Sequence, residues 1–210
     1  MKKYRIPSKN ADVRGYAAWK NLKYLVFYMA LVVIMNLAFW SYLGRRPIGL
    51  EPLKWWVYPL FEAITVVGGW FVCCMSRFVS DRYACGRIRS MRIVRSYGRA
   101  LSRQAKLTVG FYNYVKVDLA CESGPKSVNI QIFEDGYDGY YREGGTLVKF
   151  RGLNYPLCLE SEAEGVHVCT VCGVRSYDKD AERIDGMLVC RSCGRSMIDV
   201  EDLESEKRDF

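Results

Sequence analysis

Four cysteines in the last quarter of the chain stand in two matched pairs. The first pair is Cys169 and Cys172, the second is Cys190 and Cys193, and a glycine follows each pair. Seventeen residues separate the pairs, so the pattern is C-x2-C-x17-C-x2-C. Two cysteines three positions apart on a tight turn can place both sulfurs on one metal ion, and a second such turn completes a tetrahedron. The spacing therefore predicts a metal site with four thiolate ligands.

Residues 168–196 resemble the zinc-ribbon class, and the first pair with its neighbours, Cys-Thr-Val-Cys-Gly, is similar to a rubredoxin knuckle. The resemblance implies metal binding and no particular function. Rubredoxins generally have a longer interval and a proline inside the second pair, where this chain has Arg191-Ser192. Zinc is therefore favoured over iron. Because cysteine fills all four coordination positions, we expect a structural site rather than a catalytic one.

The remaining residues offer no catalytic constellation. His167 is the only histidine of the chain, which argues against a histidine-based triad or a metalloprotease. It could serve as an alternative metal ligand, but a complete set of four thiolates makes it redundant. The sequence has no Walker A motif, no dinucleotide-binding glycine motif after a strand and no nucleophile elbow. A peptidase or a nucleotide-driven pump is therefore disfavoured.

Two apolar blocks precede the region that contains the cysteines. The first, Tyr24 to Leu43, carries no charge and no polar face, and as a helix it would measure about 30 Å, the thickness of a bilayer core. The second runs from Trp55 to Ser76, with Pro59 and Glu62 near its start. We therefore expect a transmembrane hairpin over residues 24–76, with helices at 24–43 and 55–76.

The distribution of Lys and Arg predicts how this hairpin is oriented. Residues 1–23 carry seven Lys/Arg, and a second basic segment follows the hairpin at 77–105. The connecting loop, 44–54, carries only three. Under the positive-inside rule both termini are cytoplasmic, which predicts an integral protein of the plasma or inner membrane. A cytosolic location also disfavours disulfides between the paired cysteines.

The basic segment 77–105 permits two interpretations of its structure. Charged residues at steps of three and four would form one face of a helix: Arg92, Arg95, Arg99, Arg103 and Lys106. Equally, a strand could start at Arg87. The charges are either a solvated face that also signals topology or a contact with anionic lipid headgroups. RNA binding ranks third.

Residues 106–160 alternate in hydrophobicity and contain glycine-rich turns, which predicts a small antiparallel β domain, a barrel or a sandwich. A linker at 161–168, the zinc ribbon at 169–196 and an acidic tail at 197–210 complete the chain. The predicted fold class is thus an α+β membrane protein with a two-helix transmembrane hairpin, a β domain and a C-terminal zinc ribbon.

Two polar residues fall inside the predicted helices. In an antiparallel hairpin, Asn36 and Glu62 would both lie about 10 Å below the same interface. Intramembrane acids usually face protein and find a partner. We therefore expect either that these two side chains pair, or that Glu62 reaches back to the nearby interface.

The leading functional hypothesis is a non-enzymatic, membrane-anchored protein whose β domain and zinc ribbon contact an unidentified protein partner. A small oligomeric transporter or channel that uses Glu62 and Asn36 is one alternative, and it would be a homo-oligomer. A rubredoxin-like iron electron carrier is another. Nucleic acid is a disfavoured partner, because residues 169–193 carry four basic and four acidic side chains and a metal with four thiolates adds about −2.

Overall fold

The computed structural model describes residues 4–44, 54–73, 75, 79, 81–101, 107–131 and 139–205. The chain folds into two compact units. The helical unit comprises Ala18–Asp81, and the α+β unit combines Met1–Ala17 with Arg82–Phe210. Helix α1, Ala11–Gly44, begins in the α+β unit and continues in the helical unit.

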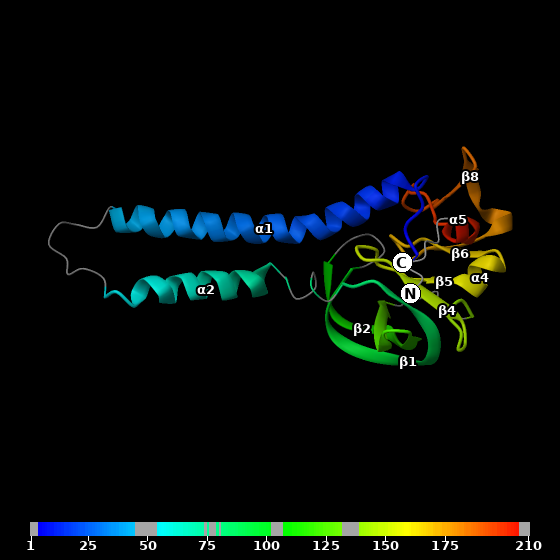
Figure 1. Ribbon diagram of the computed structural model, residues 1–210, viewed down its shortest axis with the longest axis horizontal. Helices are drawn as coiled ribbons and strands as arrows, with labels where there is room; N and C mark the ends of the chain where they lie inside the picture. The colour runs from blue at the N-terminus through cyan, green and yellow to red at the C-terminus, as the bar shows by residue number, and fades with distance from the viewer. Residues whose placement is uncertain are drawn as a thin grey trace. The chain divides into compact units, whose positions relative to one another are not determined.

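In the helical unit, α1 packs against α2, Val57–Val72. The Tyr28 hydroxyl donates to the Val66 carbonyl over 3.3 Å. Further along α1, Phe39 stacks on Phe61 with ring centroids 4.0 Å apart. Later residues of α1 thus meet earlier residues of α2, so the two helices form an antiparallel hairpin (Figure 1).

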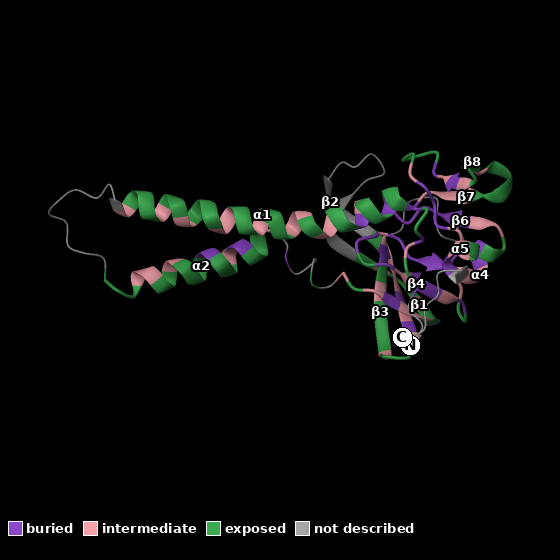
Figure 2. Ribbon diagram, turned by 45° about the horizontal axis from the view of Figure 1, so that its top comes forward, coloured by how far each residue is buried: buried purple, intermediate pink, exposed green. Residues whose placement is uncertain are grey.

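The outside of this hairpin is apolar. Helix α1 is long and apolar enough to cross a membrane, and no residue in its 18-residue apolar stretch is buried. Phe27, Ile34 and Leu37 expose 66%, 62% and 64% of their surface. Figure 2 shows exposed and intermediate residues along this part of α1, whereas α2 has a buried face. At 16 residues, α2 is shorter than the helix predicted over 55–76.

The α+β unit contains one antiparallel sheet of five strands in the order β3-β2-β1-β4-β5. The strands are β1 Ala84–Leu101, β2 Leu107–Cys121, β3 Gly124–Gln131, β4 Thr146–Lys149 and β5 Leu157–Cys158. Among the described residues β3 and β5 are the edges of this sheet. Residues 106–160 therefore contribute to one open antiparallel sheet. The prediction of an antiparallel β domain is confirmed, but its form as a barrel or a sandwich is wrong.

The helical interpretation of the basic segment is wrong, because β1 occupies most of it and pairs with β2 and β4. Alternate residues of a strand point to opposite faces, so Arg92 and Arg95 cannot share the face that helical spacing implied. The side chain of Arg99 and all of Arg103 and Lys106 lie outside the described residues.

Short elements follow β5 in a continuous succession. They are α4 Leu159–Ala163, β6 Val166–Val168, β7 Arg175–Tyr177, the 3-10 helix η1 Asp178–Asp180, β8 Glu182–Ile184, β9 Met187–Val189 and α5 Val200–Ser205. Strands β6–β7 and β8–β9 form two antiparallel hairpins, which we call the ribbon, residues 166–197. The predicted linker 161–168 is instead folded structure with Glu162 buried, and the predicted tail contributes the buried residues Ile198 and Leu203.

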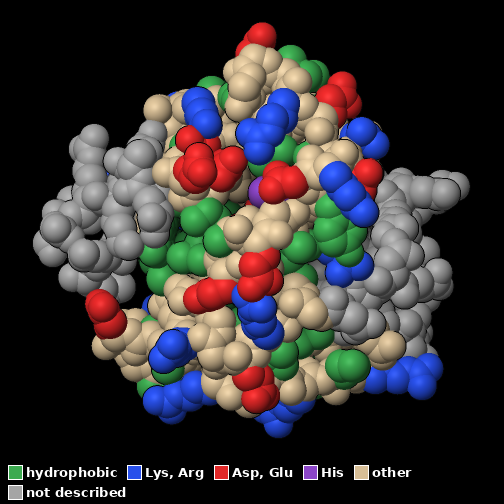
Figure 3. Space-filling model, turned by 90° about the vertical axis from the view of Figure 1, so that its right-hand side faces the viewer, with side chains coloured by type: hydrophobic (Ala, Val, Ile, Leu, Met, Phe, Trp, Pro, Cys, Tyr) green, Lys and Arg blue, Asp and Glu red, His purple; other side chains and the backbone are tan. Residues whose placement is uncertain are grey.

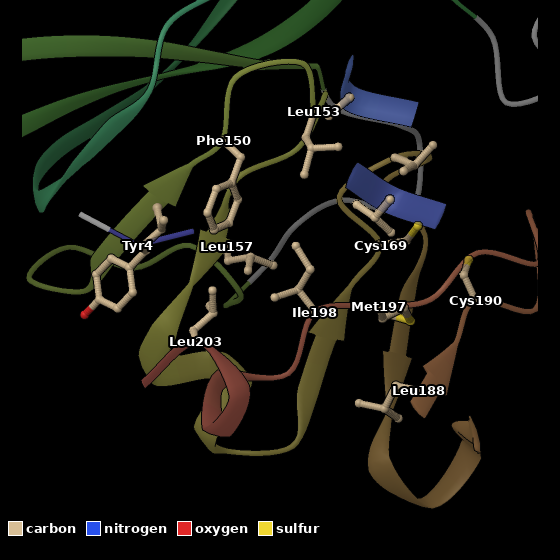
Figure 4. Packing of buried hydrophobic residues seen from close by; sticks show 14 residues of the cluster. Tyr4, Phe150, Leu153, Leu157, Cys169, Leu188, Cys190, Met197, Ile198 and Leu203 are labelled. Carbon is tan, nitrogen blue, oxygen red and sulfur yellow. The ribbon is translucent and has the colours of Figure 1, made fainter. Parts of the chain in front are cut away.

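Strands β4 and β5 separate two hydrophobic cores. Leu147 pairs with Cys158, and both side chains enter the sheet-side core, which lies against β1, β2 and β3. Their neighbours Val148 and Leu157 also pair, and both enter the ribbon-side core. Figure 4 shows this second core, where Leu157 lies among residues of the N-terminal segment (residues 4–17), the ribbon and α5. The ribbon is therefore packed into the unit rather than appended to it.

Candidate metal centre

The first cysteine pair lies on a tight turn between β6 and β7. The Cys169 N–H donates to the Val174 carbonyl over 2.9 Å, and the Gly173 N–H donates to the Cys169 carbonyl over 2.8 Å. Gly173 has a φ of 78°, in the left-handed region that a side chain disfavours. The glycine after the pair thus lets the chain fold back so that both cysteines point to one side.

The second cysteine pair, after β9, repeats this geometry. The Cys190 N–H donates to the Arg195 carbonyl over 2.9 Å, and the Gly194 N–H donates to the Cys190 carbonyl over 2.8 Å. Gly194 has a φ of 67°. The two turns, which we call knuckles, are therefore built from equivalent hydrogen bonds at equivalent positions.

The knuckles bring all four cysteine sulfurs within 4.8 Å of one another. The Sγ atoms of Cys169 and Cys193 are 3.6 Å apart, and those of Cys172 and Cys190 are 3.5 Å apart. A tetrahedral zinc with Zn–S bonds of about 2.3 Å places its sulfurs about 3.8 Å apart. The sulfur positions therefore fit a tetrahedral metal ion, and the set predicted from spacing is brought together as one group.

This donor set has the composition of a closed metal site. Four thiolates complete a tetrahedral coordination shell and leave no open position for water or substrate. Cys169 and Cys190 are fully buried, whereas Cys193 is exposed. A metal ion here would join the two knuckles to each other beside the ribbon-side core, because Cys169 and Cys190 belong to that core.

The loop between β4 and β5 braces the first knuckle. The backbone N–H groups of Asn154 and Tyr155 both donate to the Thr170 carbonyl over 3.0 Å. The Asn154 side-chain amide donates to the Val171 carbonyl over 2.7 Å. The sheet thus fixes the position of the turn that carries Cys169 and Cys172.

The N-terminal segment, residues 4–17, contacts the chain just after the second knuckle. The Asn10 side-chain amide donates to Ser196 Oγ and to the Met197 carbonyl, both over 3.0 Å. The Asp12 carboxylate accepts the Ser196 N–H over 2.9 Å and also its hydroxyl. The β4–β5 loop therefore supports the first knuckle, and the N-terminal segment contacts the chain that follows the second.

His167 is engaged elsewhere and does not join the sulfur cluster. Its Nδ1 lies 2.7 Å from Glu162 Oε2, and its Nε2 lies 2.9 Å from Asp178 Oδ1. These partners, Glu162 foremost, raise the pKa of His167 to about 9 although burial opposes the charge. An imidazolium whose two ring nitrogens face carboxylates is not a metal ligand.

Sequence reasoning missed the buried group around Glu162. Besides His167, its carboxylate accepts the Tyr140 hydroxyl and the Val168 N–H, the latter over 3.0 Å. Glu162 falls in the predicted linker 161–168, and Tyr140 in the predicted β domain 106–160. Only the solitary histidine five residues after an acid could have suggested the contact.

The predicted pairing of Asn36 with Glu62 does not occur in the hairpin. The Asn36 amide donates to the Val32 carbonyl of its own helix over 3.0 Å. The Glu62 side chain is exposed. No hydrogen bond joins the two among the described residues.

Comparison of this chain with protein-family models, with curated proteins and with solved structures finds no match in any of the three.

Proposed function

We propose that this protein is a non-enzymatic membrane protein that presents a zinc-stabilised α+β unit to a protein partner in the cytosol. The observation that carries the proposal is the exposed apolar surface of α1. A continuous apolar surface of this size is unfavourable in water, whereas lipid tails solvate it. A core helix of a soluble protein would instead be covered by the rest of the fold.

The α+β unit is built from both ends of the chain, which supports a hairpin that enters and leaves the membrane on the same side. Residues before the hairpin and residues after it belong to the same folded unit. A chain that enters a membrane from this unit must therefore come back, and α2 supplies the return. At 16 residues α2 measures about 24 Å, so tilt or local thinning of the bilayer would accompany insertion. The flanking Lys and Arg residues favour the cytoplasmic side for the unit.

A structural zinc ion is the occupant that the four thiolates favour. Their sulfur spacing suits a tetrahedral ion, and their closed arrangement suits a stabilising role. An iron centre would use the same ligands, and its red colour as isolated would distinguish it from colourless zinc.

The surface of the α+β unit favours a protein partner over nucleic acid. Acidic and basic side chains are intermingled over the face seen in Figure 3. On the ribbon, Tyr177 and Ile184 are exposed large side chains of the kind found in protein interfaces. Arg92 and Arg95 are exposed on strand β1, so they remain candidates for contact with anionic lipid headgroups.

Site-directed labelling in cells tests this function. The background replaces with alanine the cysteines outside the cluster, Cys73, Cys74, Cys85, Cys121 and Cys158. A cysteine introduced at Gly49, which lies outside the described residues, should react with an impermeant maleimide in intact cells. One introduced at Ser205 should react only after permeabilisation. The reverse labelling pattern would contradict the orientation, and extraction of the protein by alkaline carbonate would contradict insertion.

A further inference from the structure

The N-terminal segment and the sulfur ligands share one hydrophobic core. Val13 and Ala17, in the first two turns of α1, are buried in the ribbon-side core. Cys169 and Cys190 belong to the same core. The start of the apolar helix is therefore docked on the structure that the cysteines organise.

The residues that receive this segment are positioned by the second knuckle. The Arg195 carbonyl accepts the Cys190 N–H, and the Met197 N–H donates to the Leu188 carbonyl over 2.7 Å. Ser196, between them, forms a β-bridge with Val189. The second knuckle thus holds Arg195, and β9, the strand that leads into this knuckle, holds Ser196 and Met197.

The N-terminal segment makes its contacts with residues 195–197 at fixed positions, so a change in the conformation of the second knuckle would break them. Asn10 is fully buried and depends on Ser196 and Met197 for its amide hydrogen bonds. Arg195 lies over the Tyr16 ring, with its guanidinium carbon 4.8 Å from the ring centroid. A buried amide that loses its partners is strongly destabilising, so release into water becomes the favoured alternative.

We propose that the four-cysteine centre is a metal-dependent clamp on the start of α1. With metal bound, the second knuckle holds residues 195–197 in the conformation that receives Asn10 and Asp12. On metal loss the knuckle relaxes and the N-terminal segment leaves the α+β unit, which frees the first turns of α1. This inference rests on the proposed function, in which the cysteines hold zinc. Because coupling is reciprocal, the docked segment must also strengthen metal binding.

Hydrogen exchange on the full chain in detergent tests the clamp directly. Metal analysis first establishes that zinc is retained. After removal of zinc by a chelator, amides of residues 10–17 should exchange roughly tenfold faster or more, and zinc addition should restore their protection. Amides of residues 114–121 in β2 should not change. Faster exchange confined to the ribbon would overturn the clamp and leave the structural zinc site standing. A chain that retains no zinc would overturn the metal site itself.

Reciprocal coupling gives a second measurement with a matched control. Asn10→Ala and Asp12→Ala should each lower zinc affinity about fivefold or more in competition with a chromophoric chelator. Lys9→Ala removes another polar contact of the same segment, the ion pair with Asp202 at 2.5 Å, which does not involve residues 195–197. Its zinc affinity should match that of the unmodified protein. If Asp12→Ala does not fold, Asp12→Asn keeps the side-chain size and tests the charge. Equal zinc affinities in all these variants would overturn the clamp.

Discussion

Glu162 and His167 form a buried contact in which the carboxylate Oε2 lies 2.7 Å from the ring Nδ1. Both side chains are almost entirely shielded from solvent. The contact joins α4 to β6. His167 lies two residues before Cys169, the first cysteine of the first knuckle. It therefore positions the ribbon without contributing a ligand.

Replacing this histidine should destabilise the α+β unit without removing its metal. His167→Phe leaves a buried carboxylate without its cationic partner, a change that typically costs about 3–5 kcal/mol. Chemical denaturation in detergent measures the loss, and metal analysis of the folded protein should still find zinc. The control is Arg142→Ala, which removes the exposed ion pair with Glu164 and should change stability little. A folded His167→Phe protein without zinc would contradict this role.

Glu160 should make stability depend on pH in the acidic range. Burial opposes its charge, but hydrogen bonds, including one from the Thr146 N–H at 2.7 Å, hold the pKa of Glu160 below its usual 4.5. Its contribution is therefore present above pH 4.5 and is lost as the pH falls through the lower, folded-state pKa.

The measurement is the difference in unfolding free energy between the unmodified protein and Glu160→Gln. That difference should be largest near neutral pH and should shrink in acid. Comparing the two proteins at each pH cancels the acid sensitivity of the metal site. A difference that stays constant into acid would contradict the assignment.

One metal ion per chain is expected on the four cysteines, and Cys190→Ser should remove it. Because Cys190 belongs to the ribbon-side core, limited proteolysis should reach the N-terminal segment as well as the ribbon. Binding of structural zinc is worth about 10–16 kcal/mol in small zinc-finger peptides, so the loss should be large. The control Cys121→Ser, a half-buried cysteine outside the cluster, should retain the metal. Unchanged protease resistance after Cys190→Ser would count against a structural site.

Two adjacent glycines of α2 should differ sharply in their tolerance of a side chain. A Cβ at Gly69 would lie 3.3 Å from Tyr28 Cε2 and 3.6 Å from Leu31 Cδ2, whereas a Cβ at Gly68 would have nothing within 4 Å. Gly69→Val should therefore push the helices apart, at a typical overpacking cost of about 1–3 kcal/mol.

The test for this pair is the thermal midpoint of the hairpin in detergent. Gly68→Val places the same residue one position away on the same helix, so it controls for helix propensity. It should melt close to the unmodified protein, and Gly69→Val should melt earlier. Equal midpoints would show that the two helices do not pack at Gly69.

Local patterns in the sequence were sufficient to group the four cysteines and to place two apolar helices, although α1 begins at Ala11 rather than at Tyr24 and α2 ends at Val72 rather than at Ser76. Two cysteines separated by two residues and followed by glycine can form a knuckle from local hydrogen bonds alone, as Cys169 and Cys190 do. Sustained apolarity likewise identified α1. In the basic segment the local pattern was misleading, because the three- and four-residue spacing of its charges suits a helix whereas the pairing of β1 with β2 and β4 makes it a strand. A β-bulge between Ile88 and Ser90 also shifts the alternation of β1, so that Ile88 and Met91, three residues apart, both face the core.

Only the tertiary structure decided how the parts of the α+β unit support the metal centre. The contacts of Asp12 with Ser196 join residues 184 positions apart, and no periodicity or spacing encodes a contact at that separation. The buried contact between Glu162 and His167 likewise involves a residue distant in sequence. Tyr140, which precedes β4, donates its hydroxyl to the Glu162 carboxylate. From its sequence neighbours alone, Glu162 is compatible with either a solvated loop or a buried hydrogen-bond network. It is buried because the folded chain brings Tyr140 and His167 to its carboxylate.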